Sequence, residues 1–95
     1  MPDKNLLELK KTTQFRKDLK RVVKRRLNVD LLDEIILTLR ERKSLDPKYR
    51  DHALTGDFAG FRECHIQPDW LLIYMVDDKK LILTASRTGT HSDLF

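Results

Sequence analysis

The stretch FRECHIQPDWLLIYMVDDKKLILTAS, residues 61–86, decides the fold of this chain. It contains three extended segments, at 61–66, 70–76 and 81–86, which are separated by short polar connections. The segment 70–76 is apolar at both alternating sets of positions, which is typical of a central strand. The stretch therefore predicts three consecutive antiparallel strands.

Two amphipathic helices are predicted before these strands. Thr12 or Thr13 is a suitable N-cap for the first helix, and apolar residues then recur at helical spacing. Asn28 is predicted to end this helix, and Asp30 is predicted to cap the second. The apolar faces are formed by Phe15, Leu19, Val22 and Val23 in the first helix and by Leu32, Ile35, Ile36 and Leu39 in the second.

The remaining segments complete an α+β domain. Residues 5–11 alternate partly and predict a first strand, whereas residues 48–60 predict a loop, because Pro47 cannot continue the second helix. The element order is β-α-α-β-β-β, with a helical hairpin packed on one face of a small antiparallel sheet. A chain of 95 residues has room for one hydrophobic core, so we expect a single domain, residues 1–95.

Charge is spread unevenly along the chain. Residues 1–50 hold 15 Lys/Arg against 8 Asp/Glu, whereas residues 51–95 hold 4 against 7. The basic half can attract a polyanion or an acidic protein, although a basic helix face is also common as solvated surface. Neither a membrane span nor a secretory signal is recognisable, so we expect a cytoplasmic protein without membrane contact. The single cysteine, Cys64, excludes an intramolecular disulfide.

All three histidines lie in the C-terminal half, among groups that suit phosphate chemistry. Imidazole is the side chain that acts as acid or base near neutral pH. RNA cleavage without metal needs a base for the ribose 2′-hydroxyl, an acid for the departing 5′-oxygen and a cation for the phosphoryl charge. The catalytic candidates are His52, His65, Asp69, Arg87 and His91, and Trp70 is a candidate for stacking on a base.

No metal is expected, because the histidines are 13 and 26 residues apart and form no HxH or HxxxH pair. No cofactor is expected either.

The candidate residues also have ordinary structural explanations. These are a solvated group for His52, a core residue for His65 and Trp70, a turn residue for Asp69, a tail residue for His91 and a frayed end for Phe95.

Strand alternation predicts the face on which each residue lies. Cys64 and Ile66 are expected to face the helices, which places His65 on the open face of the sheet. Arg87 raises a difficulty, because strict alternation places it on the same side as the apolar residues Leu83 and Ala85. Either a bulge reverses the facing before Arg87, or the regular strand has ended there.

Three motifs taken together resemble the YafQ-type toxins of the RelE/ParE superfamily, which are the toxins of bacterial type II toxin–antitoxin pairs. The motifs are DHALxG at 51–56, FRECHIxPDWLLIY at 61–74 and RTGTHSxLF at 87–95, where x is a position that does not contribute to the resemblance. The resemblance covers the whole chain in layout and is close from residue 45 onward. It implies a RelE-like fold and a ribosome-dependent endonuclease that cuts mRNA in the ribosomal A site.

The resemblance also implies roles for individual residues. His52 and His65 would be general-base candidates or would orient the 2′-hydroxyl. His91 and Asp69 would be general-acid candidates. Arg87 would stabilise the negative charge of the phosphorane, and Phe95 would position the substrate. Trp70 matches a position beside the family's catalytic set.

The implied partners are a ribosome, its mRNA and an acidic antitoxin. The basic first helix, including Lys17 and Arg21, would face ribosomal RNA, the antitoxin or both. Antitoxins of this kind wrap their toxin and repress their own operon, so operator DNA is reached only through the antitoxin. RelE relies on a C-terminal tyrosine, whereas Phe95 has no phenolic proton, which favours the histidine-based subgroup.

Two other functions are compatible with the same fold. A ParE-like protein would inhibit DNA gyrase by binding, without catalysis. A basic adaptor would bind nucleic acid without cutting it. The three histidines and Arg87 favour the nuclease, because a binding module needs no acid–base pair.

Overall fold

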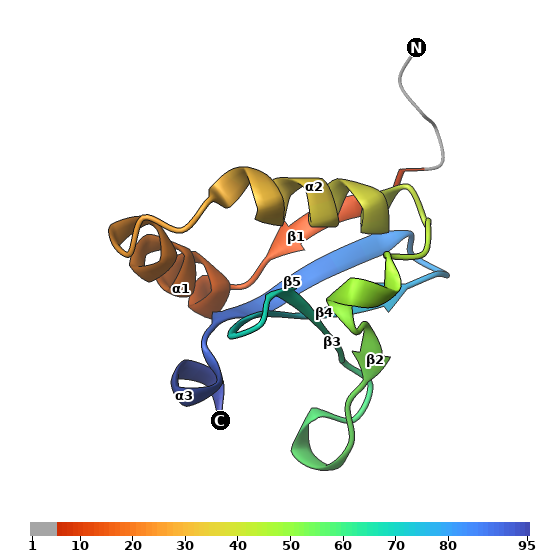
Figure 1. The fold of residues 1–95 in the computed structure, drawn as a ribbon. Helices are drawn as coiled ribbons and strands as arrows, with labels where there is room; N and C mark the ends of the chain where they lie inside the picture. Colours follow the sequence, from red (N-terminus) through yellow and green to blue (C-terminus); the bar gives the residue numbers. More distant parts are fainter. Residues whose placement is uncertain (1–5) are drawn as a thin grey trace.

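The computed structural model describes residues 6–95, so Asn5, the first residue of the expected N-terminal strand, lies outside the described part (Figure 1). The α+β class and the order of the expected elements are confirmed. Among residues 6–95, no helix has the length and apolar character needed to cross a membrane. The elements are β1 (Glu8–Lys11), α1 (Thr13–Lys24), α2 (Val29–Arg40), the 3-10 turn η1 (Pro47–Tyr49), β2 (His52–Ala53), the 3-10 turn η2 (Gly56–Phe58), β3 (Arg62–Gln67), β4 (Trp70–Asp77), β5 (Ile82–Gly89) and α3 (His91–Leu94).

The sheet has five strands in the order β1-β5-β4-β3-β2. The three strands of the opening stretch pair antiparallel as expected, but β1 pairs parallel with β5. The sheet is therefore mixed. The helical hairpin carries the chain from β1 at one edge of the sheet towards β2 at the other, and β3, β4 and β5 then lead back until β5 lies beside β1. The strand β2 was expected to be loop; two residues are too few to show an alternating pattern.

The helix ends follow from capping. Thr12 caps α1, and its hydroxyl oxygen accepts a hydrogen bond from the Phe15 backbone N–H. Asn28 caps α2 by accepting from the Asp30 N–H, so the expectation that Asn28 ends the first helix and Asp30 caps the second is wrong. An asparagine side chain satisfies the N–H two residues later as readily as it ends a helix.

Both faces of β4 are buried, which confirms its central position. Leu72 and Tyr74 pack with residues of α1 and α2, including Phe15 and Ile35. Figure 1 shows these two helices over one face of the sheet. The opposite face was expected to stay open, but it carries a second cluster formed by Leu71, Ile73 and Leu94 with the partly buried Leu54, Phe58 and Phe61.

A β-bulge at Ser86 resolves the difficulty with Arg87. Tyr74 pairs with Ala85 and Ile73 pairs with Arg87, so Ser86 is the extra residue. The bulge reverses the facing, so Arg87 leaves the strand on the face of its pair partner Ile73 and not on that of Ala85, and its long side chain still reaches Asp18 of α1. The strand continues to Gly89, so the first of the two alternatives is correct.

Candidate functional site

The three histidines lie together, although they are far apart in the sequence. The ring centroids of His52 and His65 are 6.4 Å apart, and those of His65 and His91 are 5.6 Å apart. The rings come from three elements, β2, β3 and the first turn of α3. A row of three imidazoles on one surface is therefore the centre of the candidate site.

His52 is positioned by a short, anchored segment. It pairs with Glu63 of β3, and its Nδ1 lies 2.7 Å from the carbonyl oxygen of Arg50. The neighbouring Asp51 carboxylate accepts hydrogen bonds from the Tyr74 hydroxyl at 2.5 Å and from Arg62 Nε at 3.3 Å. Burial, followed by this carboxylate, raises the pKa of Tyr74 above its usual range. The Asp51 anchor therefore holds the His52 segment against the sheet.

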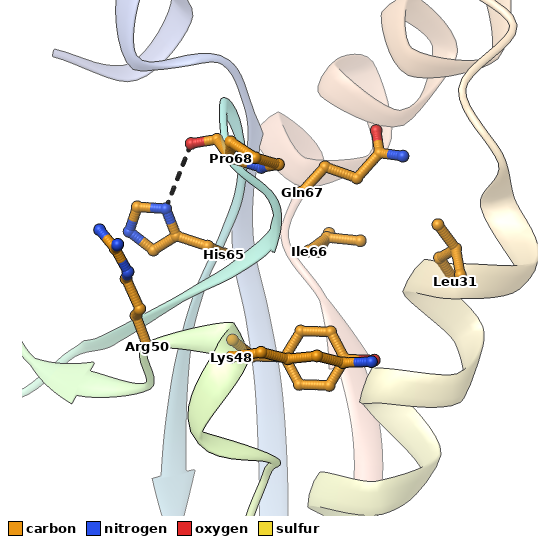
Figure 2. Close-up of a pocket in the computed structure, with 8 residues that line it drawn as sticks. Leu31, Lys48, Arg50, His65, Ile66, Gln67 and Pro68 are labelled. Carbon is orange, nitrogen blue, oxygen red and sulfur yellow. Dashed lines mark hydrogen bonds between the residues drawn. The ribbon is translucent and has the colours of Figure 1, made fainter.

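His65 has an oxygen atom near each ring nitrogen. Its Nδ1 lies 3.3 Å from the carbonyl oxygen of Pro68, the contact drawn as a dashed line in Figure 2. Its Nε2 lies 3.3 Å from Oε1 of Glu63, whose side chain is buried. A neutral imidazole can donate to only one of these two oxygens, and which one depends on its tautomer. Glu63 was not among the expected site residues, although strand alternation already placed it on the face of His65.

His91 is held by Asp69. One carboxylate oxygen, Oδ1, accepts the backbone N–H of His91 at 3.0 Å and lies 2.7 Å from the ring Nδ1. The hydrogen bonds from the backbone and then the side chain of His91 hold the pKa of Asp69 below its usual range. Asp69 thus does more than hold its own turn: it orients an imidazole that lies 22 residues further along the chain.

Arg87 is bound to helix α1 rather than free. Its Nε and Nη2 donate to the two oxygens of Asp18 at 2.7 and 3.3 Å. The Asp18 side chain is fully buried, and it also accepts from the Thr88 N–H and from Gln14. Burial alone would raise the pKa of Asp18, but the hydrogen bonds from Arg87, Gln14 and Thr88 outweigh it and hold that pKa below its usual value. About a quarter of the Arg87 side chain, 26%, remains exposed.

The expectation that Trp70 stacks on a substrate base is wrong. Trp70 is 2% exposed, and its indole N–H donates to the Thr88 hydroxyl at 2.9 Å. That hydroxyl donates in turn to the Leu71 carbonyl oxygen, so the indole belongs to a satisfied core. The alternative reading of Trp70 as a core residue is the correct one.

The other expected binding residues lie on the surface. Phe95 is 62% exposed, and its ring packs edge-on against Phe58 with centroids 5.4 Å apart. Lys17 and Arg21 are exposed on α1, and Arg21 Nη1 lies 3.4 Å from a carboxylate oxygen of Asp93. Exposed basic and aromatic side chains therefore flank the C-terminal helix that carries His91.

One oxygen or nitrogen atom from each of Glu63, His65 and His91 lies within 4.8 Å of the others, which makes these residues a candidate metal-ligand set. Imidazole and carboxylate together suit zinc or copper. The spacing along the chain does not reveal this set, because its members come from β3 and from the start of α3. Histidine spacing along the chain therefore does not exclude a metal site in the folded protein.

Known proteins match this chain over most of its length. The family model of the bacterial toxin YafQ of type II toxin–antitoxin systems matches residues 7–95. The mRNA interferase toxin YafQ of Escherichia coli K12 is 40% identical over 83 residues, which cover 86% of this chain and 88% of that protein.

Two solved structures have the same fold. The crystal structure of a metal-bound toxin from Helicobacter pylori has a TM-score of 0.90 and 40% identity, and the match covers 95% of this chain and 100% of that one. The toxin in the E. coli DinJ–YafQ toxin–antitoxin complex has a TM-score of 0.86 and 36% identity over 95% and 98% of the two chains.

Proposed function

The chain belongs to the YafQ family of toxins from bacterial type II toxin–antitoxin systems, and on this premise we propose that it cuts mRNA on the ribosome by acid–base catalysis. The observation that supports the chemistry is the row of imidazoles, with ring centroids 5.6 and 6.4 Å apart. Two imidazoles in opposite protonation states serve as base and acid, and each contributes roughly 10²–10⁴-fold.

In the proposed reaction the ribose 2′-oxygen attacks the adjacent phosphorus. One imidazole, His52 or His65, takes the proton of the 2′-hydroxyl as the new P–O bond forms. The bond from phosphorus to the 5′-oxygen breaks, and His91 gives that oxygen a proton. The products are a 2′,3′-cyclic phosphate and a 5′-hydroxyl.

The remaining residues orient the catalytic imidazole and the substrate, and stabilise the charge on the phosphoryl oxygens. Asp69 keeps a proton on Nδ1 of His91, so that Nε2 is the nitrogen that meets the leaving group. Arg87, held by Asp18, supplies positive charge to the phosphoryl oxygens. The exposed ring of Phe95 positions the substrate. The reaction as written moves only protons and one phosphoryl bond, and we propose that it proceeds without a metal.

The proposed setting is the ribosomal A site in the cytoplasm, with the whole chain, residues 1–95, acting as one domain. The exposed cations of α1, including Lys17 and Arg21, face ribosomal RNA or the acidic antitoxin. Contact with operator DNA is made by the antitoxin.

The test is expression of the chain alone in bacteria, with the ends of cellular messages mapped. We expect growth arrest and cuts inside codons, both abolished by His65→Ala and by His91→Ala. Each variant should keep the circular dichroism spectrum and the antitoxin binding of the unmodified protein. Lys79→Ala, in the turn after β4, is the matched control and should cut normally.

The same experiment separates the alternatives. Intact messages with accumulating DNA breaks would identify a ParE-like gyrase inhibitor instead. Growth arrest that persists in both histidine variants without any cut message would point to a basic adaptor that blocks translation by binding.

A further inference from the structure

A cavity of about 490 Å³ opens beside His65, between α2, η1 and the end of β3 (Figure 2). His65 forms part of its wall and is also the middle ring of the histidine row. A group seated in the cavity would therefore lie next to the proposed reaction. None of the catalytic roles described above uses this space.

Two basic side chains line the cavity. Lys48 and Arg50 line it, and Figure 2 shows the Arg50 guanidinium on the same side as the His65 ring. The Lys48 ammonium lies over the ring of Tyr49, 5.1 Å from its centroid. None of the described residues that line the cavity is a carboxylate. The charge therefore fits an anionic ligand, such as a phosphate of a polynucleotide.

The rest of the cavity has apolar walls and one amide. Leu31, Ile66 and Pro68 line it together with Tyr49, and such walls fit the flat face of a nucleobase. Gln67 also lines it and offers a donor and an acceptor on one exposed side chain. An amide of this kind can read the hydrogen-bonding edge of an unpaired base.

The strand edge at the cavity is also open. β2 begins at His52, opposite Glu63, and no strand among residues 6–95 pairs with that side of residues 65–67. Backbone groups along this edge are available to a ligand that has its own donors and acceptors. An unpaired base meets this condition together with the apolar walls, and the adjoining cations suit its phosphate.

We propose that this cavity binds the base of the nucleotide next to the scissile phosphate, with Lys48 and Arg50 contacting the RNA backbone and Gln67 selecting the base. The inference rests on the proposed RNA cleavage, because it is that reaction which brings RNA to His65. It makes Gln67 a specificity-determining residue and gives Arg50, which was not among the expected site residues, a role in binding.

Binding is tested without catalysis by nuclear magnetic resonance on the ¹⁵N-labelled full chain. The probes are four homodinucleotides whose first sugar lacks the 2′-hydroxyl and which therefore resist cleavage. We expect saturable shifts at the amides of 48–50 and 65–67, and different affinities for the four bases. Gln67→Ala should reduce these differences by about fivefold, the equivalent of one hydrogen bond. Lys79→Ala should change nothing.

Shifts confined to the exposed face of α1, or the same base ranking in Gln67→Ala, would overturn the inference. The same shifts produced by an acidic peptide of matched charge, with equal affinity, would also overturn it. They would mean that the cavity recognises charge alone.

Cleavage on programmed ribosomes separates this inference from the proposed function. Gln67→Ala should cut at a comparable kcat with a relaxed preference for the adjoining base, and Lys48→Gln should raise KM. If the unmodified chain cuts but both variants behave like it, the cavity inference fails and the proposed function stands. If the unmodified chain cuts nothing yet the dinucleotides bind as expected, the cleavage proposal fails and the nucleotide pocket stands.

Discussion

Asp69 and His91 are joined through a single carboxylate oxygen, which accepts the His91 backbone N–H at 3.0 Å and lies 2.7 Å from the ring Nδ1. The first contact holds the start of α3 against the β3–β4 turn. The second keeps a proton on Nδ1 whether the ring is neutral or charged, so that Nε2 is the nitrogen that takes up and gives away a proton. One side chain therefore sets both the place and the protonation pattern of this imidazole.

Asp69→Asn should slow cleavage more than it changes stability. The amide oxygen still accepts the backbone N–H, but the negative charge that favours the Nδ1–H form is lost. We expect the single-turnover rate to fall by about 10- to 100-fold, which is less than the ~10⁴-fold cost of losing a buried orienting carboxylate. Asp78→Asn, in the turn after β4, is the matched control. An unchanged rate in Asp69→Asn would remove Asp69 from the mechanism.

Asp18→Asn should destabilise the fold, because it leaves Arg87 without its carboxylate partner in a largely buried place. Breaking such a pair from one side costs about 3 kcal/mol in the free energy of unfolding. Urea denaturation at pH 7 measures this cost. Asp30→Asn, on the exposed start of α2, should stay within about 0.5 kcal/mol of the unmodified chain. A similarly small effect for Asp18→Asn would contradict the structural role of the pair.

The stability lost in Asp18→Asn should depend on pH, because the pKa of Asp18 is lowered in the folded protein. A carboxyl whose pKa is lower in the folded state stabilises the fold above its unfolded value, here near 3.8, and loses this contribution as the pH falls through the folded value. The stability gap between the unmodified chain and Asp18→Asn should therefore be constant from pH 7 to about pH 5 and shrink below about pH 4. A gap that widened in acid would show that Asp18 is not the ionised partner of Arg87.

The parts of the fold that periodicity encodes were predictable from the sequence. Alternation placed Cys64 and Ile66 against the helices and His65 on the other face, and all three lie there. The cap of α2 was misplaced, because Asn28 and Asp30 are both good caps and only their surroundings decide between them. The parallel pairing of β1 was not predictable, since a short edge strand carries no local sign of its partner's direction.

The candidate site was predictable in composition but not in its connections. The histidines were identified as residue types, whereas the partners Glu63 and Asp18 became visible only with the packing. The bulge at Ser86 decides on which face of the sheet Arg87 leaves the strand. A single inserted residue is not recognisable in the apolar pattern of the sequence. The sequence leaves two explanations for Trp70, a core residue or a residue that stacks on a base, because its burial is decided by the strands around it.

Trp70→Phe should lower stability without affecting the substrate. It removes the indole donor to the Thr88 hydroxyl and part of a buried ring. We expect a loss of about 2–4 kcal/mol in the free energy of unfolding and an unchanged KM for programmed ribosomes. Phe95→Ala is the opposite case, because its exposed ring should affect KM but not stability. A raised KM in Trp70→Phe at a temperature where it is fully folded would restore a binding role.

Arg25→Ala should loosen the C-terminal helix. Arg25 donates to both oxygens of Asp93 at 2.6 and 3.2 Å, and Asp93 also accepts the Thr90 N–H that begins α3. The hydrogen bonds from Arg25 and then Thr90 hold the pKa of Asp93 well below its usual range. We expect faster hydrogen exchange at residues 91–95 and a cleavage rate that falls by about tenfold, because His91 moves with the helix.

Lys24→Ala, the neighbouring exposed position on α1, is the control for loss of charge. It should leave both hydrogen exchange and cleavage unchanged. The exchanged pair Arg25→Asp with Asp93→Arg should recover only part of the rate, because arginine cannot accept the Thr90 N–H. Equal effects of Lys24→Ala and Arg25→Ala would mean that general positive charge, not this pair, supports activity.

Added Cu²⁺ or Zn²⁺ should inhibit cleavage. The ligand atoms of Glu63, His65 and His91 lie within 4.8 Å of one another, and an ion held there would occupy the imidazoles that the proposed reaction needs for proton transfer. Cu²⁺ should act at lower concentration than Zn²⁺, following the usual order of affinities at nitrogen and oxygen sites. Inhibition should weaken as the pH falls, because protons compete with the ion for the imidazole nitrogens. Titration calorimetry and cleavage assays measure the two effects together.

The variant Glu63→Gln distinguishes inhibition by metal at this site from inhibition by metal bound elsewhere on the protein. Loss of one carboxylate ligand should weaken Cu²⁺ binding at least about tenfold and raise the inhibitory concentration to match. Asp57→Asn, in the exposed turn η2, should leave both values unchanged. A chelator should restore the inhibited enzyme and leave untreated enzyme fully active. If the chelator instead abolished cleavage and Zn²⁺ restored it, the metal-free mechanism would be wrong, and this ligand set would belong to the catalytic machinery.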